Sequence, residues 1–210
     1  MRTMTRQPGL LSYRLPKRIL DVAGSFVALI ALSPAMFVIA LTIWLEDRDA
    51  PVLFRQRRCG RDGRTFELLK FRTMVPNADA LKELMREQSL VPWPDFRVRN
   101  DPRVTRLGRV LRRTSLDELP QLINVIRGDM ALVGPRPTSF AATTYELWQT
   151  ARLDFTPGIT GPWQVAGRDS MNFEERCRLE IRFFRTHSLR RELWLLIATL
   201  GSVVRRTGVA

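Results

Sequence analysis

The sequence predicts an α+β protein that is mostly helical, with an N-terminal re-entrant membrane helix, a small β-hairpin, and further helices lying on the membrane face. Three observations predict this class. Residues 22–45 form an uncharged apolar run, residues 51–74 have strand-like patterns around a glycine-rich turn, and the remainder shows helical periodicity broken by Pro and Gly. The composition, 45% hydrophobic and 26% charged, is that of a chain with an ordinary globular core.

The apolar run from Val22 to Leu45 contains no charged residue over 24 positions. This exceeds the roughly 20 residues that a helix needs to cross a bilayer. The run is too long for the apolar core of a cleavable signal peptide, and no small-residue cleavage site follows it. A plain transmembrane helix is therefore one interpretation.

A re-entrant helix is the second interpretation, and we favour it because of the break at Ser33 and Pro34. An internal Pro removes a helix hydrogen bond and kinks the axis, and the Ser hydroxyl can satisfy the carbonyl that is freed. Basic residues flank both ends, which favours a cytoplasmic location for each. They are Arg2, Arg6, Arg14, Lys17 and Arg18 before the run, and Arg48, Arg55, Arg57, Arg58, Arg61 and Arg64 after it. We divide the chain into residues 1–46, the basic segment with its membrane helix, and residues 47–210, a domain on the cytoplasmic face.

The first part of the second domain is predicted to be a hairpin followed by short helices. Two strands surround the turn 59–63. Asn77 is a candidate N-cap for a helix over residues 77–88. A later helix over residues 104–113 separates an apolar face from an arginine face.

The C-terminal third is predicted to contain turns followed by two helices. Residues 156–169 are rich in Gly and Pro and predict turns. Asn172 and Glu175 form a capping pair at the start of the next helix. The last helix, residues 188–206, has arginine pairs at both ends of an apolar, Trp-containing body. This pattern fits either a helix in the lipid interface or a packed core helix.

The charge balance points to phosphate-bearing partners. Lys and Arg number 34 against 21 acidic residues, a net charge of +13. Such an excess fits nucleotides, anionic lipids or nucleic acid, although a solvated basic surface gives the same count. Cys59, Cys177 and His187 are the only residues of their kinds, which excludes a disulfide framework and a His/Cys metal site and fits a reducing, cytoplasmic-side environment.

Two adjacent acids, Asp117 and Glu118, follow an arginine-rich segment. Either Ser115 and Glu118 form a capping box or Asp117 is itself the N-cap, and Pro120 favours the later start. In both cases the acids lie in the first helical turn, where free N–H groups and the macrodipole favour ionised carboxylates. A plain helix cap explains the pattern. The alternative is a reacting centre, since an ionised Asp can attack phosphorus and a neighbouring Glu can hold Mg²⁺.

Basic side chains in other segments fit phosphoryl chemistry at these acids. Arg112 precedes the pair, Lys70 and Arg72 end a predicted strand, and Arg136 lies between two prolines. Cationic clamps of this kind stabilise a transferring phosphoryl group.

Several segments in order resemble the bacterial sugar transferase family, the monotopic phosphoglycosyl transferases that act on polyprenyl phosphate. They are KRILDVAGSFVALIALSPAMF, LLKFRTM, LRRTSLDELPQLINVIRGDMALVGPRP and PGITGPWQVAGR. The resemblance covers roughly residues 13 to 208 and is collinear. The chain resembles the minimal form of the family, without the additional transmembrane helices and domain of larger members.

The resemblance implies an enzyme with a catalytic dyad, Asp117 and Glu118. Asp117 would attack the sugar-bearing phosphate of a UDP-sugar and release UMP, and undecaprenyl phosphate would take the sugar phosphate in a first step of exopolysaccharide synthesis. Glu118 would bind the cofactor Mg²⁺, and Ser33 and Pro34 would break the re-entrant helix. The expected substrate-binding residues are Lys70, Arg72, Arg112, Arg136, Gln164 and Arg168.

The same resemblance implies galactose or glucose as the sugar and the inner membrane as the location, with the catalytic domain on the cytoplasmic face. Membrane lipids, a homodimer and downstream glycosyltransferases are the further expected partners, and nucleic acid is not expected.

Two other classes of protein compete with this interpretation. The arginine-rich stretch 97–113 could follow a nucleic-acid backbone from a membrane tether, but aromatic residues do not interleave with it as a stacking platform requires. A basic scaffold that recruits partners to the membrane is the third class, and it needs no Asp117–Glu118 pair. Release of UMP from UDP-sugars with polyprenyl phosphate and Mg²⁺ separates the three.

Overall fold

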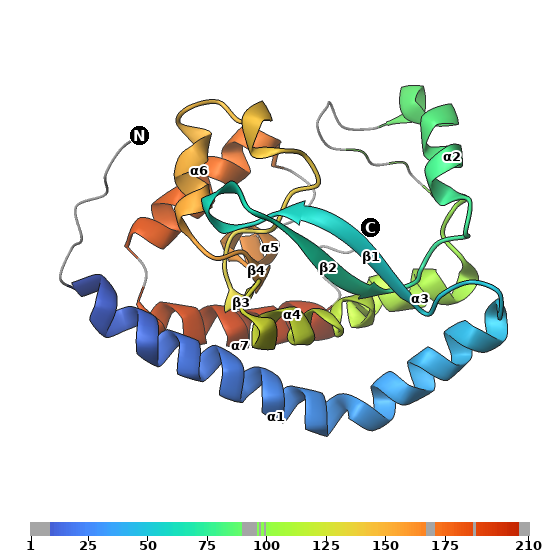
Figure 1. Ribbon diagram of the computed structural model, residues 1–210, viewed down its shortest axis with the longest axis horizontal. Coiled ribbons are helices and arrows are strands. Elements are labelled where there is room, and N and C mark those ends of the chain that lie inside the picture. Colours follow the sequence, from blue (N-terminus) through green and yellow to red (C-terminus); the bar gives the residue numbers. More distant parts are fainter. Residues whose placement is uncertain are drawn as a thin grey trace.

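The computed structural model describes residues 9–89, 96, 98, 100–166, 171–186 and 188–205, and it is mostly helical with two small sheets. Helix α1 (Gly9–Glu46) runs along one edge of the molecule with helix α7 (Leu189–Arg205) beside it (Figure 1). Within the described residues, α1 is the one helix long and apolar enough to cross a membrane. Large apolar side chains of its central part are more than half exposed: Phe26, Val27, Ile30, Phe37 and Val38.

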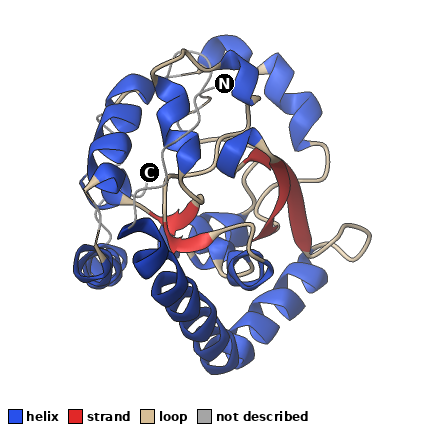
Figure 2. Cartoon of the chain, turned by 60° about the vertical axis from the view of Figure 1, so that its left-hand side comes forward, coloured by secondary structure: helices blue, strands red, loops and turns tan. Residues whose placement is uncertain are grey.

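Helix α1 is continuous through its internal prolines but bends between two arms, which form a V in Figure 2. Pro34 has no N–H to donate to the carbonyl of Ile30, four residues earlier. The Ser33 hydroxyl donates to that carbonyl instead, with 2.8 Å between Oγ and O. The sequence prediction that Ser33 satisfies a freed carbonyl is confirmed.

Both arms of α1 dock on the rest of the molecule. In the first arm, Arg18 donates to the carbonyls of Val125 and Ile126 at 2.6 and 2.9 Å. In the second arm, Ile39 and Ile43 are buried against Phe71 and Leu111. The body therefore contacts α1 on either side of its bend.

Strands β1 (Leu53–Cys59) and β2 (Thr65–Phe71) form the predicted hairpin. They are antiparallel, and Leu53 pairs with Phe71 while Cys59 pairs with Thr65. A short 3₁₀ turn (Arg61–Gly63) joins them, and Asp62 and Gly63 adopt positive φ there. The alternating apolar face of β2 packs Leu68 against Val125 and Met130.

Three helices follow the hairpin: α2 (Ala78–Leu84), α3 (Arg106–Thr114) and α4 (Gln121–Arg127). Asn77 occupies the N-cap position of α2 as predicted, but its side chain makes no capping hydrogen bond. Helix α3 packs close to the chain after β2, because a Cβ at Gly108 would lie 2.1 Å from the carbonyl oxygen of Thr73. Only glycine permits this approach.

The Gly/Pro-rich segment is more ordered than the turns that the sequence predicted. Strand β4 (Gly158–Thr160) pairs in parallel with β3 (Ala131–Val133), and helix α5 (Pro162–Ala166) follows directly. The prediction of turns alone was wrong for these residues because a long-range partner strand supplies the hydrogen bonds that local patterns cannot reveal. Helix α6 (Phe173–Arg185) starts with the predicted Asn172–Glu175 capping box.

Helix α7 combines the two alternatives left open by its sequence. Leu195 is buried against Val133 and Phe184, and Glu192 is also buried. Trp194 and Ile197 on another face are 62% and 70% exposed. One face therefore packs in the core, and another apolar face remains exposed.

Candidate active site

The acid pair lies on a 3₁₀ turn (Leu116–Glu118) between α3 and α4, at the end of a sharp reversal. Ser115 adopts a left-handed conformation with φ of 56° and ends α3. Its side chain makes no capping hydrogen bond, and α4 begins only at Gln121. The predicted capping box is therefore wrong, and the two acids lie in the first turn of the 3₁₀ helix that precedes α4 and not in α4 itself.

Asn124 links helix α4, which follows the acid pair, to the hairpin. It is completely buried in α4, where its Nδ2 donates to the carbonyl of Glu67 at 2.7 Å and its Oδ1 accepts the N–H of Leu69 at 3.0 Å. The side chain thus pairs with β2 as a neighbouring strand would. Lys70, next along β2, is brought to the two acids as a result. Sequence analysis missed Asn124, and its only signal was a polar residue inside an apolar helix.

Lys70 and Arg136 converge on Glu118. Lys70 Nζ and Arg136 Nη2 each lie 2.8 Å from Glu118 Oε1. Lys70 Nζ also lies 3.6 Å from Asp117 Oδ2. Asp117 is 6% exposed, and the Glu118 side chain is also largely enclosed. Residues from β2, the 3₁₀ turn and the segment after β3 therefore meet at one point.

The two carboxyl groups have opposite pKa shifts. Burial raises the pKa of Asp117 above its usual range, Lys70 opposes this shift, and the neighbouring charge of Glu118 adds to it. Burial also disfavours the ionised form of Glu118, but Arg136 and Lys70 outweigh it and hold its pKa well below the usual range. The local backbone does not lower the pKa of Asp117 as the sequence suggested, because desolvation is the largest influence on this group and raises its pKa.

Arg112 lies near the acid pair, whereas Arg72 does not. Arg112 lies on the last turn of α3, donates from Nε to Thr73 Oγ1 at 2.9 Å, and lowers the pKa of Asp117 without contacting it. Arg72 points away from the pair. It is buried and donates to the carbonyls of Ile43, Asp47 and Pro51, so that it holds the C-terminal end of α1. Arg72 is not brought to the acid pair.

Gln164 and Arg168 are the other predicted substrate-binding residues. Gln164 is buried in α5, where its Nε2 donates to the carbonyl of Ile159 at 2.8 Å and its Oε1 has no partner among the described residues. Arg168 lies outside the residues that the structure describes.

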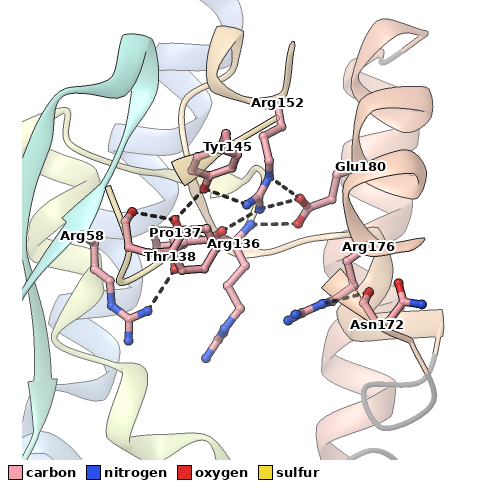
Figure 3. Close-up of polar contacts among 10 residues, drawn as sticks. Arg58, Arg136, Pro137, Thr138, Tyr145, Arg152, Asn172, Arg176 and Glu180 are labelled. Atoms are coloured by element: carbon pink, nitrogen blue, oxygen red, sulfur yellow. Dashed lines mark hydrogen bonds and ion pairs between the residues drawn. The ribbon is translucent and has the colours of Figure 1, made fainter. Parts of the chain in front are cut away.

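Arg136 is held in place by two residues that sequence analysis missed. The backbone N–H of Arg136 donates to Glu180 Oε1 at 3.0 Å, and Arg152 Nη2 donates to the Arg136 carbonyl at 2.8 Å (Figure 3). Arg152 and Glu180 also pair with each other at 2.6 Å, almost completely buried. For Glu180, the sequence signal was an acid inside the basic, amphipathic helix α6.

The two carboxylates fit the predicted Mg²⁺. No group of three or more acidic, His or Cys residues able to hold a metal occurs in the described part of the chain. Mg²⁺ in phosphoryl-transfer sites needs only one or two carboxylates, because water and substrate phosphates complete its shell. Both cations contact Oε1 of Glu118, so its Oε2, which has no partner among the described residues, is open to a metal.

Comparison with known proteins decides the family. Residues 12–206 match the family described as bacterial sugar transferase. The chain belongs to this family. The sequence resemblance found in the motifs around Asp117 and Glu118 is therefore confirmed at the level of the family.

Three relatives show the range of the family. The chain is 41% identical over 206 residues to the UDP-galactose-lipid carrier transferase of Erwinia amylovora, a match that covers 94% of this chain and 42% of that protein. It is 39% identical over 199 residues to the UDP-glucose:undecaprenyl-phosphate glucose-1-phosphate transferase of Caulobacter vibrioides, covering 90% of this chain and 70% of that one. It is 37% identical over 201 residues to the exopolysaccharide production protein ExoY of Rhizobium meliloti, covering 92% and 88%. The chain thus spans less than half of the first relative and most of the third.

Proposed function

We propose that this chain transfers a hexose-1-phosphate from a UDP-sugar to undecaprenyl phosphate and releases UMP. The observation that carries the proposal is the Asp117–Glu118 pair, enclosed with Lys70 and Arg136 in a chain of the bacterial sugar transferase family. The names of its relatives add galactose and glucose as sugars and undecaprenyl phosphate as acceptor. The product would be the first lipid-linked intermediate of exopolysaccharide synthesis.

In the first step, a carboxylate oxygen of ionised Asp117 attacks the sugar-bearing phosphorus of the UDP-sugar. The new bond joins this oxygen to phosphorus, and the bond between phosphorus and the bridging oxygen breaks. UMP leaves with that oxygen, so an aspartyl phospho-sugar remains on the protein. Lys70 and Arg136 lie where they can neutralise charge on the phosphoryl oxygens.

In the second step, a phosphate oxygen of undecaprenyl phosphate attacks the same phosphorus. The bond to Asp117 breaks, the carboxylate is regenerated, and undecaprenyl diphospho-sugar is released. The buried position of Asp117 supports this route, because water is kept from the acyl phosphate between the two steps.

Glu118 is the residue that would hold Mg²⁺, beside the nucleophile Asp117. When bound, the ion supplies positive charge that offsets the negative charge of the diphosphate. The low pKa of Glu118 keeps this carboxylate ionised over the whole physiological range, which suits a ligand. The raised pKa of Asp117 reflects the burial that also keeps water from this group.

We propose further that α1 is re-entrant and that the catalytic part lies on the cytoplasmic face of the inner membrane. Both arms of α1 pack on the same body, whereas the apolar side chains around the bend face outward. A straight spanning helix would place its two ends about 30 Å apart across the bilayer. Basic flanks at both ends also support a shared cytoplasmic side.

Single cysteines test the topology. Arg14→Cys and Arg64→Cys lie at exposed positions on either side of the membrane segment, and native Cys59 and Cys177 are buried. We expect both introduced thiols to be protected from an impermeant maleimide in intact cells and labelled after the inner membrane is opened. Labelling of one of them from outside would contradict the re-entrant arrangement.

The covalent step is tested by intact-protein mass spectrometry. The protein is incubated with UDP-galactose or UDP-glucose and Mg²⁺, without any lipid acceptor. We expect UMP release of at most one equivalent and a phospho-hexose adduct that peptide mapping places on Asp117. An adduct on Glu118, or normal transfer that needs both substrates bound at once and forms no adduct, would replace this route by another.

A further inference from the structure

A concave region adjoins the acid pair through Arg136 and lies between β1 and the first half of α6. Its volume is about 410 Å³, including the open space at its entrance. Figure 3 looks into this region, with Arg58 coming from the hairpin on one side and Arg176 and Glu180 from α6 on the other. The lining residues are Arg58, Arg136, Pro137, Thr138, Ser139, Phe140, Arg152, Trp163, Phe173, Arg176 and Glu180. We call it the α6 pocket.

Aromatic rings form much of the wall of the α6 pocket. Phe140 and Phe173 pack edge to face with 5.0 Å between their centroids. Trp163 is almost fully buried on α5. The Arg176 guanidinium lies 5.2 Å from the Trp163 ring centroid and 5.6 Å from that of Phe173. Flat π surfaces beside a guanidinium are the groups on which a nucleobase stacks.

The α6 pocket is also strongly positive. Four of its lining residues are arginines, and Glu180 is the one acid among the described lining residues. Glu180 is committed to Arg152 and to the backbone N–H of Arg136. Four arginines against one acid give the lining residues a net positive charge, which suits a ligand that carries phosphate.

Arg136 connects the α6 pocket to the reacting centre. Its Nη2 lies 2.8 Å from Glu118 Oε1, and its Cζ lies 6.0 Å from the Trp163 ring centroid. A ligand that spans this arginine has one end on the aromatic wall and the other at the acid pair. A nucleoside diphosphate sugar has this shape, because its diphosphate joins the nucleoside to the sugar.

The position of the α6 pocket favours a water-soluble ligand. Figure 1 shows α1 and α7 along one edge of the molecule, while α6 and the turn between β1 and β2 lie on the other side of β3. The exposed apolar side chains of α1 and α7 mark the side that meets lipid. A polyprenyl chain arrives from that side, whereas the α6 pocket lies away from it.

We infer that the α6 pocket binds the uridine monophosphate half of the donor, with the base against the aromatic wall of Phe140, Trp163 and Phe173. The phosphates then extend past Arg136, which places the sugar-bearing phosphorus at Asp117. Arg176 becomes a donor-binding residue that contacts the nucleotide and takes no part in bond making. This inference rests on the proposed function, because it assumes a nucleoside diphosphate sugar as donor.

Steady-state kinetics of Arg176→Ala and Phe140→Leu test the inference, with Arg178→Ala as the matched control. Arg178 lies on the same helix with its side chain 65% exposed, and it does not line the pocket. Loss of a stacking or cationic contact costs about tenfold in affinity. We expect the KM for the UDP-sugar and the inhibition constant of UMP to rise about tenfold in both pocket variants. Their kcat and their KM for the lipid acceptor should stay near wild type, as should every constant of the control.

Direct titration separates a binding defect from a folding defect. We expect wild type to bind UMP more tightly than ribose-5-phosphate, and Phe140→Leu to lose most of this preference while it retains ribose-5-phosphate affinity. Equal loss for both probes, with a lowered melting temperature, would show a folding defect and overturn the assignment of Phe140 to base stacking.

Failure of the inference is distinguishable from failure of the proposed function. Absence of UMP release by the wild-type protein would overturn the proposed function and the inference with it. Wild-type release with donor KM unchanged in both pocket variants would overturn the inference alone. A rise in the KM for the lipid acceptor, in place of the donor KM, would assign the α6 pocket to the acceptor phosphate instead.

Discussion

Two buried clusters in this molecule combine a pair of acids with a lysine, and they differ in their charge balance. In the helix clamp, Lys17 Nζ of α1 lies 2.6 Å from Asp21 and 2.8 Å from Glu192 of α7. Neutral donors complete this cluster, because Tyr13 also bonds Glu192 and the Leu132 N–H donates to Asp21. In the acid pair, two cations contact the carboxylates directly and Arg112 adds a third positive charge nearby.

The difference separates a structural cluster from a reactive one. One lysine shared by two acids leaves the helix clamp with an excess of negative charge, which repels phosphate. Its polar atoms join α1, α7 and β3, and it therefore holds the membrane helix on the body. The acid pair has cations in excess and an open carboxylate edge on Glu118. A phosphorylated substrate can therefore bind at the acid pair but not at the helix clamp.

The largest expected effect comes from removing one carboxylate from each cluster. Asp117→Asn keeps size and shape but cannot attack phosphorus, so we expect transfer to fall by roughly four orders of magnitude and the phospho-hexose adduct to disappear. Asp21→Asn changes the same group in the helix clamp and should lower stability while the adduct still forms. Mass spectrometry and UMP release measure both variants. Equal loss of the adduct in the two would remove the distinction between the clusters.

Glu118→Gln should have the next largest effect. We expect the rate to fall by roughly 10²–10³-fold, since charge stabilisation of the phosphoryl group is weakened. The Mg²⁺ concentration for half-maximal rate should rise about tenfold or more, while the adduct still forms slowly on Asp117. Glu67→Gln on β2, an exposed position, is the matched control. A rate that is reduced with unchanged Mg²⁺ dependence would show that Glu118 is not the metal ligand.

Lys17→Met tests the helix clamp alone. The change leaves Asp21 and Glu192 buried without their cation, so we expect the free energy of unfolding to fall by about 3–5 kcal/mol. Chemical denaturation in detergent micelles measures this change, with exposed Lys82→Met as the control. The protein that remains folded should transfer sugar phosphate at nearly the wild-type rate. Unchanged stability would mean that the clamp does not hold α1.

The smallest expected effect is a shift of the pH profile in Arg112→Gln. Transfer needs ionised Asp117, so the rate falls as the pH drops through the raised pKa of this group. Arg112 lowers that pKa, and its removal should move the acidic limb of kcat/KM to higher pH. The matched control, Arg113→Gln, removes an exposed charge one residue further along. A limb that stays in place, or moves to lower pH, would contradict the assignment of this limb to Asp117.

Local patterns predicted much of the fold. The hairpin, the capping box of Asn172 and Glu175, and the carbonyl bond of Ser33 depend on residues close in the chain, and all three are present. Strand β4 and helix α5 were missed because their stability comes from pairing with β3 and from burial. No pattern within residues 156–169 contains that partner.

The sequence by itself determined the identity of the acids, the family, and the apolar helix with its break. These follow from residue type, order and hydropathy, which are complete in the chain before it folds. Tertiary structure alone decided that Lys70 and Arg136 meet at Glu118, that Arg72 turns away to the carbonyls of α1, and that burial raises the pKa of Asp117. The reason is that contacts across many residues and the desolvation of a carboxyl group depend on which surfaces pack together, and packing is a property of the whole fold.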